Sequence, residues 1–458
     1  MFELSPSYRA VIPKLLHERE GNLNLLIHPE KPVWIVVNKL GLEVVTLGEK
    51  GLTLSEISKI LSNQYGVKRE EIDQDVSNFF QKLNSAGILD ATNPVKYEPS
   101  LKSLFLHLTN RCNLTCKHCY VDSSGENGEM DTQSIYSLID QLVDQGGKSI
   151  TLSGGEPLLR KDIKEVLSYA CQKLSIRFLT NGTLIDKALA QFIIDLGIHI
   201  QISLDGSNAI IHEHIRGKGN FARVMEQIRL LKEMGVEDRL NLCTTIMKYN
   251  IKNASQIIDL ADELSIKYVR FLPLRRVGRA RQLWDEINAD LGVEDYESLY
   301  EYIFYQAMKE HPSLEISSGL SGFVLSAPRG EPSGIWCPLG KNVVITAQGD
   351  CYPCVLFMTE EYHLGNVKEK TLTQIWESTI MKEFILSLGE RRFKIEKCME
   401  CSWRSFCQGG CMGMANEWKG TIWDTDEFCS FRKKLYRKTI FELASKKSSI
   451  IAKSEDCF

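Results

Sequence analysis

The middle of the chain alternates between short apolar runs and amphipathic segments. Six runs rich in β-branched and aromatic residues predict strands, and the segments between them repeat apolar residues every three or four positions, as helices do. Six β/α units in succession predict an α/β fold with a parallel sheet, which carries its functional sites at the carboxyl ends of the strands. The predicted strands are Leu104–Leu108, Ser149–Leu152, Ile176–Leu179, Ile198–Leu204, Leu240–Ile246 and Tyr268–Leu272.

Residues 1–92 have a different pattern and predict a small α+β domain. Two apolar runs separated by prolines predict a hairpin, and three amphipathic helices follow, the first capped by Asn38 and the last ended by Gly87. This outline is winged-helix-like. From Gly51 to Asp90 there are four Lys or Arg against six Asp or Glu, whereas a face that reads a DNA duplex is basic. Peptide binding at a sheet edge is therefore the expected role.

Composition and spacing divide the rest of the chain. A linker with two prolines separates the first domain from the β/α region, and a cysteine-dense segment follows a bridging region of mixed pattern. The predicted parts are a linker at 93–100, the β/α region at 101–283, the bridge at 284–336, the cysteine-dense domain at 337–430, and a C-terminal helix and tail at 431–458.

Charge and composition restrict the class of protein. The chain has 458 residues, 43% of them hydrophobic and 25% charged, which is typical of a soluble multidomain protein. A net charge of −4 gives no general attraction to nucleic acid or to anionic membrane, and no apolar run reaches the roughly 18 residues of a spanning helix. The N-terminus lacks a signal-peptide pattern, so a cytoplasmic location is expected. There, fourteen cysteines favour metal binding over disulfides.

Three cysteines directly follow the first strand of the predicted sheet. Cys112, Cys116 and Cys119 are separated by three and then two residues. Zinc knuckles prefer two pairs of cysteines and four ligands. Three thiolates that leave one iron open fit a [4Fe–4S] cluster better.

This Cys-x3-Cys-x2-Cys spacing resembles the signature of the radical S-adenosylmethionine (SAM) enzymes. The resemblance implies a partial (β/α)6 TIM-like barrel with SAM bound at the open iron of a [4Fe–4S] cluster. It also implies reductive cleavage of SAM to methionine and a 5′-deoxyadenosyl radical. Gly154, Gly155 and Glu156 follow the second strand and resemble the family's motif for the amino group of SAM.

Four further positions resemble regions of the family that contact SAM. Asn181 ends the third predicted strand, and Ser203 lies on a polar face of the fourth. Arg216 would pair with the SAM carboxylate, and His118 occupies the position of the aromatic residue that flanks the adenine. For Ser203 and Arg216 a purely structural role is the alternative.

A second group of cysteines occupies residues 337–430 and resembles the SPASM domain, which binds two further [4Fe–4S] clusters. The resemblance assigns the first auxiliary cluster to Cys337, Cys354 and Cys411. The fourth ligand of this cluster is either Cys351 or a thiolate of the substrate that binds an open iron. A structural zinc pair is the alternative for this segment. The second auxiliary cluster would take Cys398, Cys401, Cys407 and Cys429.

The N-terminal outline resembles the precursor-peptide recognition element of ribosomal peptide maturases. Together the resemblances imply a radical SAM maturase that binds a precursor peptide by its leader at residues 1–92. The expected product is a sulfur-to-carbon thioether crosslink, and the expected reductant is a flavodoxin or ferredoxin. The alternatives are formylglycine formation, as in anaerobic sulfatase maturases, another radical peptide modification (a carbon–carbon crosslink or epimerisation), and a non-catalytic electron-transfer or sensing protein.

Overall fold

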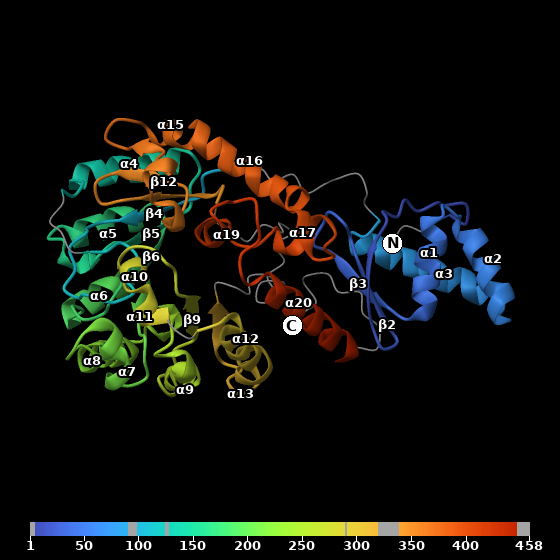
Figure 1. The fold of residues 1–458 in the computed structure, drawn as a ribbon, viewed down its shortest axis with the longest axis horizontal. Coiled ribbons are helices and arrows are strands. Elements are labelled where there is room, and N and C mark those ends of the chain that lie inside the picture. Colours follow the sequence, from blue (N-terminus) through green and yellow to red (C-terminus); the bar gives the residue numbers. More distant parts are fainter. Residues whose placement is uncertain (1–4, 90–98, 124–127, 289–290, 319–338, 447–458) are drawn as a thin grey trace.

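The computed structural model describes residues 5–89, 99–123, 128–288, 291–318 and 339–446. Figure 1 shows three regions in a row. A sheet flanked by helices lies at one end, the small N-terminal domain lies at the other, and the C-terminal helices lie between them.

Six consecutive parallel strands form the centre of the main sheet, as the sequence predicts. Each pairs with the next in chain order, and a helical segment connects each pair on the outside. Their ends differ from the predicted ends by at most one residue. The strands are β4 (Ser103–His107), β5 (Ser149–Ser153), β6 (Ser175–Thr180), β7 (His199–Ser203), β8 (Leu240–Ile246) and β9 (Tyr268–Pro273).

Four short strands extend this sheet at its two edges, and the sequence pattern does not predict them. β10 (Glu315–Ser318) is parallel to β9, and β11 (Asn342–Ile345) is parallel to β4. β12 (Asp350–Tyr352) and β13 (Gly365–Asn366) continue the edge beyond β11 as antiparallel strands. The cysteine-dense segment is thus joined to the barrel by backbone hydrogen bonds.

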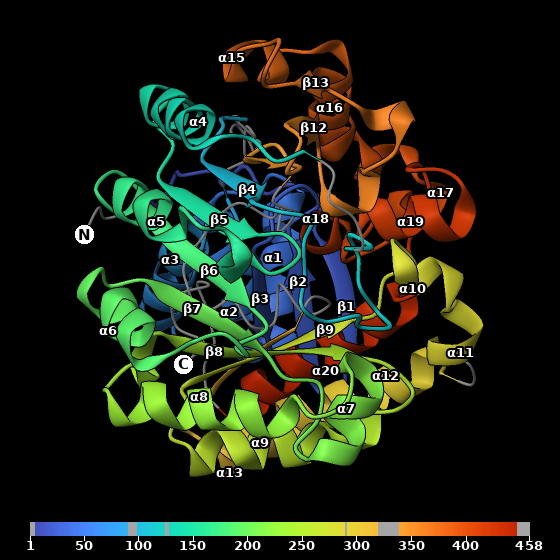
Figure 2. The same ribbon diagram turned by 90° about the vertical axis from the view of Figure 1, so that its left-hand side faces the viewer.

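The outer helices bury the apolar faces that the sequence indicates. Ile135, Leu138, Ile139 and Leu142 of α4 are all buried, and the Asp131 side chain caps that helix at the Ser134 amide. Figure 2 shows the helices arranged outside the fan of strands. They are α4 (Thr132–Asp144), α5 (Ile163–Cys171), α6 (Lys187–Asp195), α7 (Ala209–Arg216), α8 (Phe221–Glu233) and α9 (Ala254–Glu263).

Helices make up most of the remaining described structure. The bridging region contains α10 (Arg279–Gln282), α11 (Trp284–Asn288), α12 (Val293–Tyr302) and α13 (Met308–Glu310). The C-terminal region contains α15 (Leu372–Trp376), α16 (Thr379–Lys394), α17 (Glu396–Met399), α18 (Arg404–Cys407), α19 (Met412–Lys419) and α20 (Cys429–Lys446).

The N-terminal domain has three antiparallel strands followed by three helices. The Asn38 side chain accepts from the Gly41 amide at 2.9 Å and so caps α1, as predicted. The strand β1 is not predicted, because its sequence Leu-His-Glu-Arg-Glu has little apolar content. The elements are β1 (Leu16–Glu20), β2 (Leu23–Ile27), β3 (Trp34–Val37), α1 (Lys39–Glu49), α2 (Leu54–Tyr65) and α3 (Arg69–Ser85).

The sheet of this domain is buried on both faces. Leu26 and Ile35 belong to a core shared with α1–α3, whereas Leu25 and Trp34 belong to the large core that also contains Trp403, Phe406 and Tyr436. Hydrogen bonds border the contact: Arg392 donates to the Glu30 carbonyl at 2.8 Å and Arg404 donates to the Pro29 carbonyl at 3.2 Å. The N-terminal domain is therefore attached to the cysteine-dense segment by an apolar interface.

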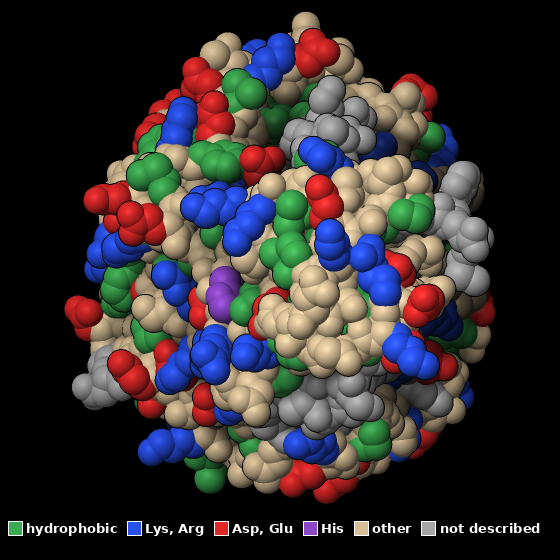
Figure 3. Space-filling model, turned by 90° about the vertical axis from the view of Figure 1, so that its right-hand side faces the viewer, with side chains coloured by type: hydrophobic (Ala, Val, Ile, Leu, Met, Phe, Trp, Pro, Cys, Tyr) green, Lys and Arg blue, Asp and Glu red, His purple; other side chains and the backbone are tan. Residues whose placement is uncertain are grey.

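Surface features agree with the expectation from composition. On the face shown in Figure 3, Lys and Arg side chains are interspersed with Asp and Glu. Among the helices of the described residues, none is long and apolar enough to cross a membrane.

Neighbouring leucines of β2 provide a test of this interface, since Leu25 and Leu26 point to opposite cores. Truncation of a buried leucine costs about 2–5 kcal/mol. In Leu26→Ala we expect faster hydrogen exchange in α1–α3. In Leu25→Ala we expect faster hydrogen exchange in α18 and α20 instead. Mass spectrometry measures the exchange in both variants. The same exchange pattern in both variants would contradict a sheet with two separate cores.

Candidate active site

The loop after β4 carries the first cysteine triplet and is held by backbone hydrogen bonds from other strands. The Gly155 amide donates to the Thr109 carbonyl at 2.7 Å, and the Glu156 amide donates to the Arg111 carbonyl at 2.8 Å. From the other side, Arg279 donates through its backbone to the Cys119 carbonyl at 2.9 Å and through its side chain to the Cys116 carbonyl at 2.8 Å. The loop is thus clamped at the carboxyl end of the barrel.

The structure brings the three thiols of this loop together. Cys112 and Cys119 lie close enough to Cys116 to raise its pKa, Cys119 also raises the pKa of Cys112, and the Ser123 hydroxyl lies 3.4 Å from the Cys119 sulfur. Burial raises the pKa of Cys116 to about 11, and the nearby Arg216 opposes that rise. Three converging thiols, one buried and two half-buried, are soft donors of the kind that hold an iron–sulfur cluster, so these residues fit one.

The two glycines after β5 are required by the approach of this loop. Gly154 has a φ of +135°, and a Cβ there would lie 2.4 Å from the Thr109 carbonyl oxygen. A Cβ on Gly155 would lie 2.2 Å from the Arg111 oxygen. The backbone of the cysteine loop approaches both glycines closely in the structure. Their contact with SAM stays a prediction.

Glu156 is fully buried and connects two strands. Its carboxylate accepts from the Thr180 hydroxyl at 2.8 Å and from the Asn181 amide at 2.8 Å. Burial raises its pKa to about 7, against the effect of these hydrogen bonds. The Asn181 side chain donates in turn to Asn113 in the cysteine loop at 2.9 Å. Glu156 therefore ties β5 to β6 and, through Asn181, to the triplet.

A buried ion pair lies beside the triplet. Arg216 Nε donates to Asp205 Oδ2 at 2.6 Å, and the other guanidinium nitrogens lie 3.3 Å from His118 Nε2 and 3.8 Å from the Cys116 sulfur. Burial lowers the pKa of His118 to about 4. Arg216 is thus held against the triplet by Asp205, and its contact with a SAM carboxylate remains a prediction. Ser203, half-buried, ends β7 two residues before Asp205.

Sequence reasoning missed Arg279, although it contacts the backbone of two of the three cysteines. It follows Gly278, where a Cβ would lie 2.4 Å from the Tyr120 carbonyl oxygen. A single Gly-Arg pair after a strand is too common to indicate this role.

The structure also brings together the four cysteines predicted for the second auxiliary cluster. One small cavity is lined by Cys398, Cys401, Cys407 and Cys429. Burial raises the pKa of Cys398, and the three other cysteines raise it further. Four thiols around one cavity are a complete ligand set for a cluster. No three His, Cys, Asp or Glu side chains in the described part of the chain are placed to hold a single metal ion.

The other predicted auxiliary ligands are only partly grouped. Cys354 and Cys411 lie near each other, since Cys411 raises the pKa of Cys354. Cys351 lies in β12, is fully buried, and has its sulfur 3.5 Å from the Gly349 carbonyl. The charged neighbours that affect its pKa are Asp350 and Lys370, and none is a cysteine. Cys337 lies outside the described residues.

Comparison with known families agrees with this arrangement. The radical SAM superfamily matches residues 106–264, the SPASM iron–sulfur cluster-binding domain matches residues 337–402, and the coenzyme PQQ synthesis protein D (PqqD) family matches residues 24–89. The chain carries radical SAM, SPASM and PqqD domains. A radical SAM domain implies SAM and a [4Fe–4S] cluster, and SPASM domains typically bind additional clusters. Cys407, Cys411 and Cys429 lie beyond the matched part of the SPASM domain.

Curated relatives of this radical SAM protein have several activities. It is 29% identical to the Fe-coproporphyrin III synthase of Methanosarcina barkeri, over 71% of this chain and 87% of that protein. It is 30% identical to the antilisterial bacteriocin subtilosin biosynthesis protein AlbA of Bacillus subtilis, over 66% of this chain and 65% of AlbA. It is 26% identical to the cysteine-type anaerobic sulfatase-maturating enzyme of Clostridium novyi, over 75% of this chain and 96% of that enzyme.

A solved structure matches nearly the whole chain. SuiB of Streptococcus suis, determined with bound S-adenosylmethionine, superposes with a TM-score of 0.59 at 18% identity and covers 92% of this chain and 100% of SuiB. At that identity the likeness shows a shared fold.

Substitution of Gly155 tests whether the glycine contact positions the triplet. In Gly155→Ala the new Cβ must displace the Arg111 carbonyl, so we expect at least a tenfold loss of SAM cleavage and lower iron retention, with the barrel still folded. Gly128→Ala is the matched control, because open space surrounds Gly128. Iron analysis and chromatography of 5′-deoxyadenosine measure both effects, and full activity of Gly155→Ala would refute the contact.

The placement of Cys351 predicts that it is not an iron ligand. We expect Cys351→Ala to retain the iron content of the wild-type protein, at some cost in stability because the thiol is buried. Cys354→Ala, three residues away, should lose iron equivalent to one cluster. Iron and sulfide analysis after anaerobic reconstitution compares the two variants. Equal losses would restore Cys351 to the ligand set.

Proposed function

We propose that this radical SAM protein is a peptide maturase that forms a sulfur-to-carbon thioether crosslink in a ribosomally made precursor. One observation supports this most strongly. The sheet of the PqqD domain is buried against the segment that contains the auxiliary cysteines. A peptide-binding domain fixed to that segment can deliver a peptide to the nearby barrel.

The triplet region provides the cofactor site in this proposal. Bound SAM supplies, on reductive cleavage, a radical that can take a hydrogen atom from a peptide. Cys112, Cys116 and Cys119 would hold the cluster. The SAM-binding residues would be His118, Gly154, Gly155, Glu156, Asn181, Ser203 and Arg216. The buried Asp205 holds the Arg216 guanidinium beside the cluster loop, which fixes its direction before any ligand binds.

The leader peptide would bind at the open edge of the N-terminal sheet. Within the described residues, β3 pairs only with β2. At the opposite edge, Arg437 of α20 donates to the Arg19 carbonyl of β1 at 2.7 Å. An extended peptide can therefore add as a fourth strand beside β3.

The segment that contains the auxiliary cysteines contacts the barrel. Arg275, two residues after β9, contacts Met414 of α19, which begins directly after Cys411. A thioether crosslink removes two hydrogens from the peptide. One leaves as a hydrogen atom, and the other leaves as a proton and an electron, which requires an electron acceptor close to the substrate. We assign this role to the cluster that Cys354 and Cys411 would help to hold.

Formylglycine formation is the second candidate, because a sulfatase-maturating enzyme is among the relatives. That reaction has no need of a leader-binding domain, so the PqqD match favours crosslinking.

The mass of the product peptide distinguishes the reactions. The protein is incubated anaerobically with SAM, dithionite and a cysteine-containing precursor peptide encoded beside its gene. We expect 5′-deoxyadenosine and a peptide lighter by two hydrogens, with a carbon–sulfur bond located by fragmentation. Replacement of the thiol by an aldehyde would indicate formylglycine, and an unchanged mass would indicate epimerisation or no reaction. The variant with all three triplet cysteines changed to alanine is the control, and it should yield neither product.

A further inference from the structure

Helix α20 begins at one proposed ligand of the second auxiliary cluster and brings positive charge to that site. Cys429 is its first residue, and Arg432 and Lys433 follow within one turn. The amino-terminal end of a helix also carries a partial positive charge. Three sources of positive potential therefore adjoin the cavity lined by Cys398, Cys401, Cys407 and Cys429.

Arg432 makes a direct contact with a ligand. Its Nε donates to the Cys407 sulfur at 3.2 Å, and the residue is buried, with 5% of its surface exposed. A second guanidinium nitrogen donates to the buried carboxylate of Asp426. This ion pair fixes the guanidinium in the plane that reaches the sulfur.

Asp426 extends the contact to the neighbouring auxiliary site. Its Oδ2 accepts from the Cys411 amide at 2.7 Å, and its Oδ1 accepts from the Phe428 amide at 3.0 Å. Gly410 allows this packing, because a Cβ there would lie 2.1 Å from the Arg432 guanidinium. One ion pair thus connects ligands of both proposed auxiliary clusters.

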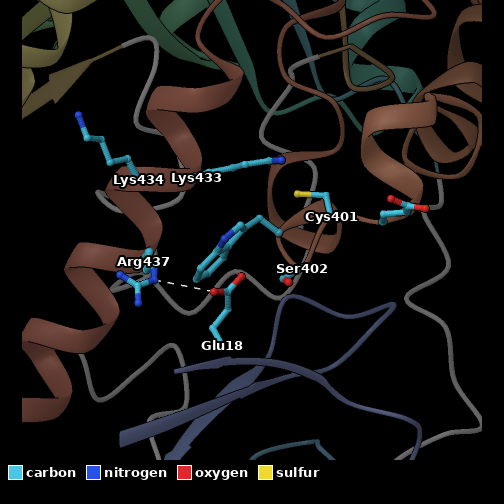
Figure 4. Close-up of a pocket in the computed structure, with 8 residues that line it drawn as sticks. Glu18, Cys401, Ser402, Lys433, Lys434 and Arg437 are labelled. Carbon is cyan, nitrogen blue, oxygen red and sulfur yellow. Dashed lines mark ion pairs between the residues drawn. The ribbon is translucent and has the colours of Figure 1, made fainter. Parts of the chain in front are cut away.

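Lys433 approaches the same site from the solvent side. It lines, together with Cys401 and Trp403, a cavity of about 250 Å³ between β1 and α20. Figure 4 shows its side chain extended toward Cys401, while Arg437 pairs with Glu18. Lys434 points away and pairs with Glu297 at 2.8 Å.

We propose that Arg432, positioned by Asp426 and assisted by Lys433, raises the reduction potential of the cluster held by Cys398, Cys401, Cys407 and Cys429. Reduction adds a negative charge to a cluster, and N–H···S hydrogen bonds and nearby cations stabilise that charge. The inference rests on the ligand set proposed above. Arg432 is a positioning and tuning residue, since it contacts a ligand and not the substrate.

The test measures the potential in full-length protein that carries only auxiliary clusters. In a background with Cys112, Cys116 and Cys119 changed to alanine, redox titration followed by electron paramagnetic resonance gives the midpoint. Arg432→Gln should lower it enough to change the reduced-to-oxidised ratio at least tenfold at a fixed potential, about 59 mV for one electron. Arg432→Lys should recover part of the change. Lys434→Gln, on the same helix, should leave the midpoint unchanged.

Each outcome decides a separate claim. Iron and sulfide analysis of the background protein, compared with Cys398→Ala in it, shows whether the four-cysteine cluster exists. Its absence would overturn the ligand set and the inference with it. A loaded cluster with an unchanged midpoint in Arg432→Gln would overturn the inference and leave the proposed function intact. If the Arg432 variants do not retain the cluster, Lys433→Gln decides: a lowered midpoint supports the inference, and an unchanged one refutes it.

Discussion

The structure depends on how closely the backbone of one loop can approach the end of a neighbouring strand. The cysteine loop after β4 contacts Gly154 and Gly155 so tightly that no side chain fits between them. The amides of Gly155 and Glu156 are thereby satisfied by carbonyls of the same loop, as buried amides must be. This contact fixes the triplet relative to β5, and the hydrogen bonds of Glu156 with Thr180 and Asn181 connect β5 to the end of β6. The position of the cysteine loop is therefore fixed by the backbone of the barrel.

The second constraint is the apolar interface of the N-terminal sheet. A small sheet is stabilised when its hydrophobic faces pack against other elements, and here both faces are covered. Its own helices supply one cover, and Trp403, Phe406 and Tyr436 belong to the other. Trp403 lies two residues after Cys401, and Phe406 directly precedes Cys407. Peptide recognition and the auxiliary site thus share one core, so a disturbance of either is expected to reach the other.

Much of this arrangement can be predicted from the sequence, for identifiable reasons. The six barrel strands are rich in apolar and β-branched residues, and this pattern predicts them. The cysteine groups were found because spacing alone restricts where thiols can lie. By contrast, β1 was missed because it is polar, and β10–β13 because strands of two to four residues have no period to detect. Arg279 and Asp426 were missed because they bind backbone groups of residues distant in sequence. Spacing also left the role of Cys351 open, and its burial in β12 leads us to predict that it is not a cluster ligand.

Helix α20 contacts both the auxiliary cavity and the N-terminal sheet. Along one helix, Cys429 faces the auxiliary cavity, Arg432 reaches the Cys407 sulfur, and Tyr436 enters the core shared with the N-terminal sheet. The next residue, Arg437, donates to the Glu20 carboxylate at the end of β1 at 2.8 Å. A rigid helix transmits displacement along its length with little loss, because its backbone hydrogen bonds act together. Movement of the N-terminal sheet would therefore alter the contact between Arg432 and Cys407, a proposed cluster ligand.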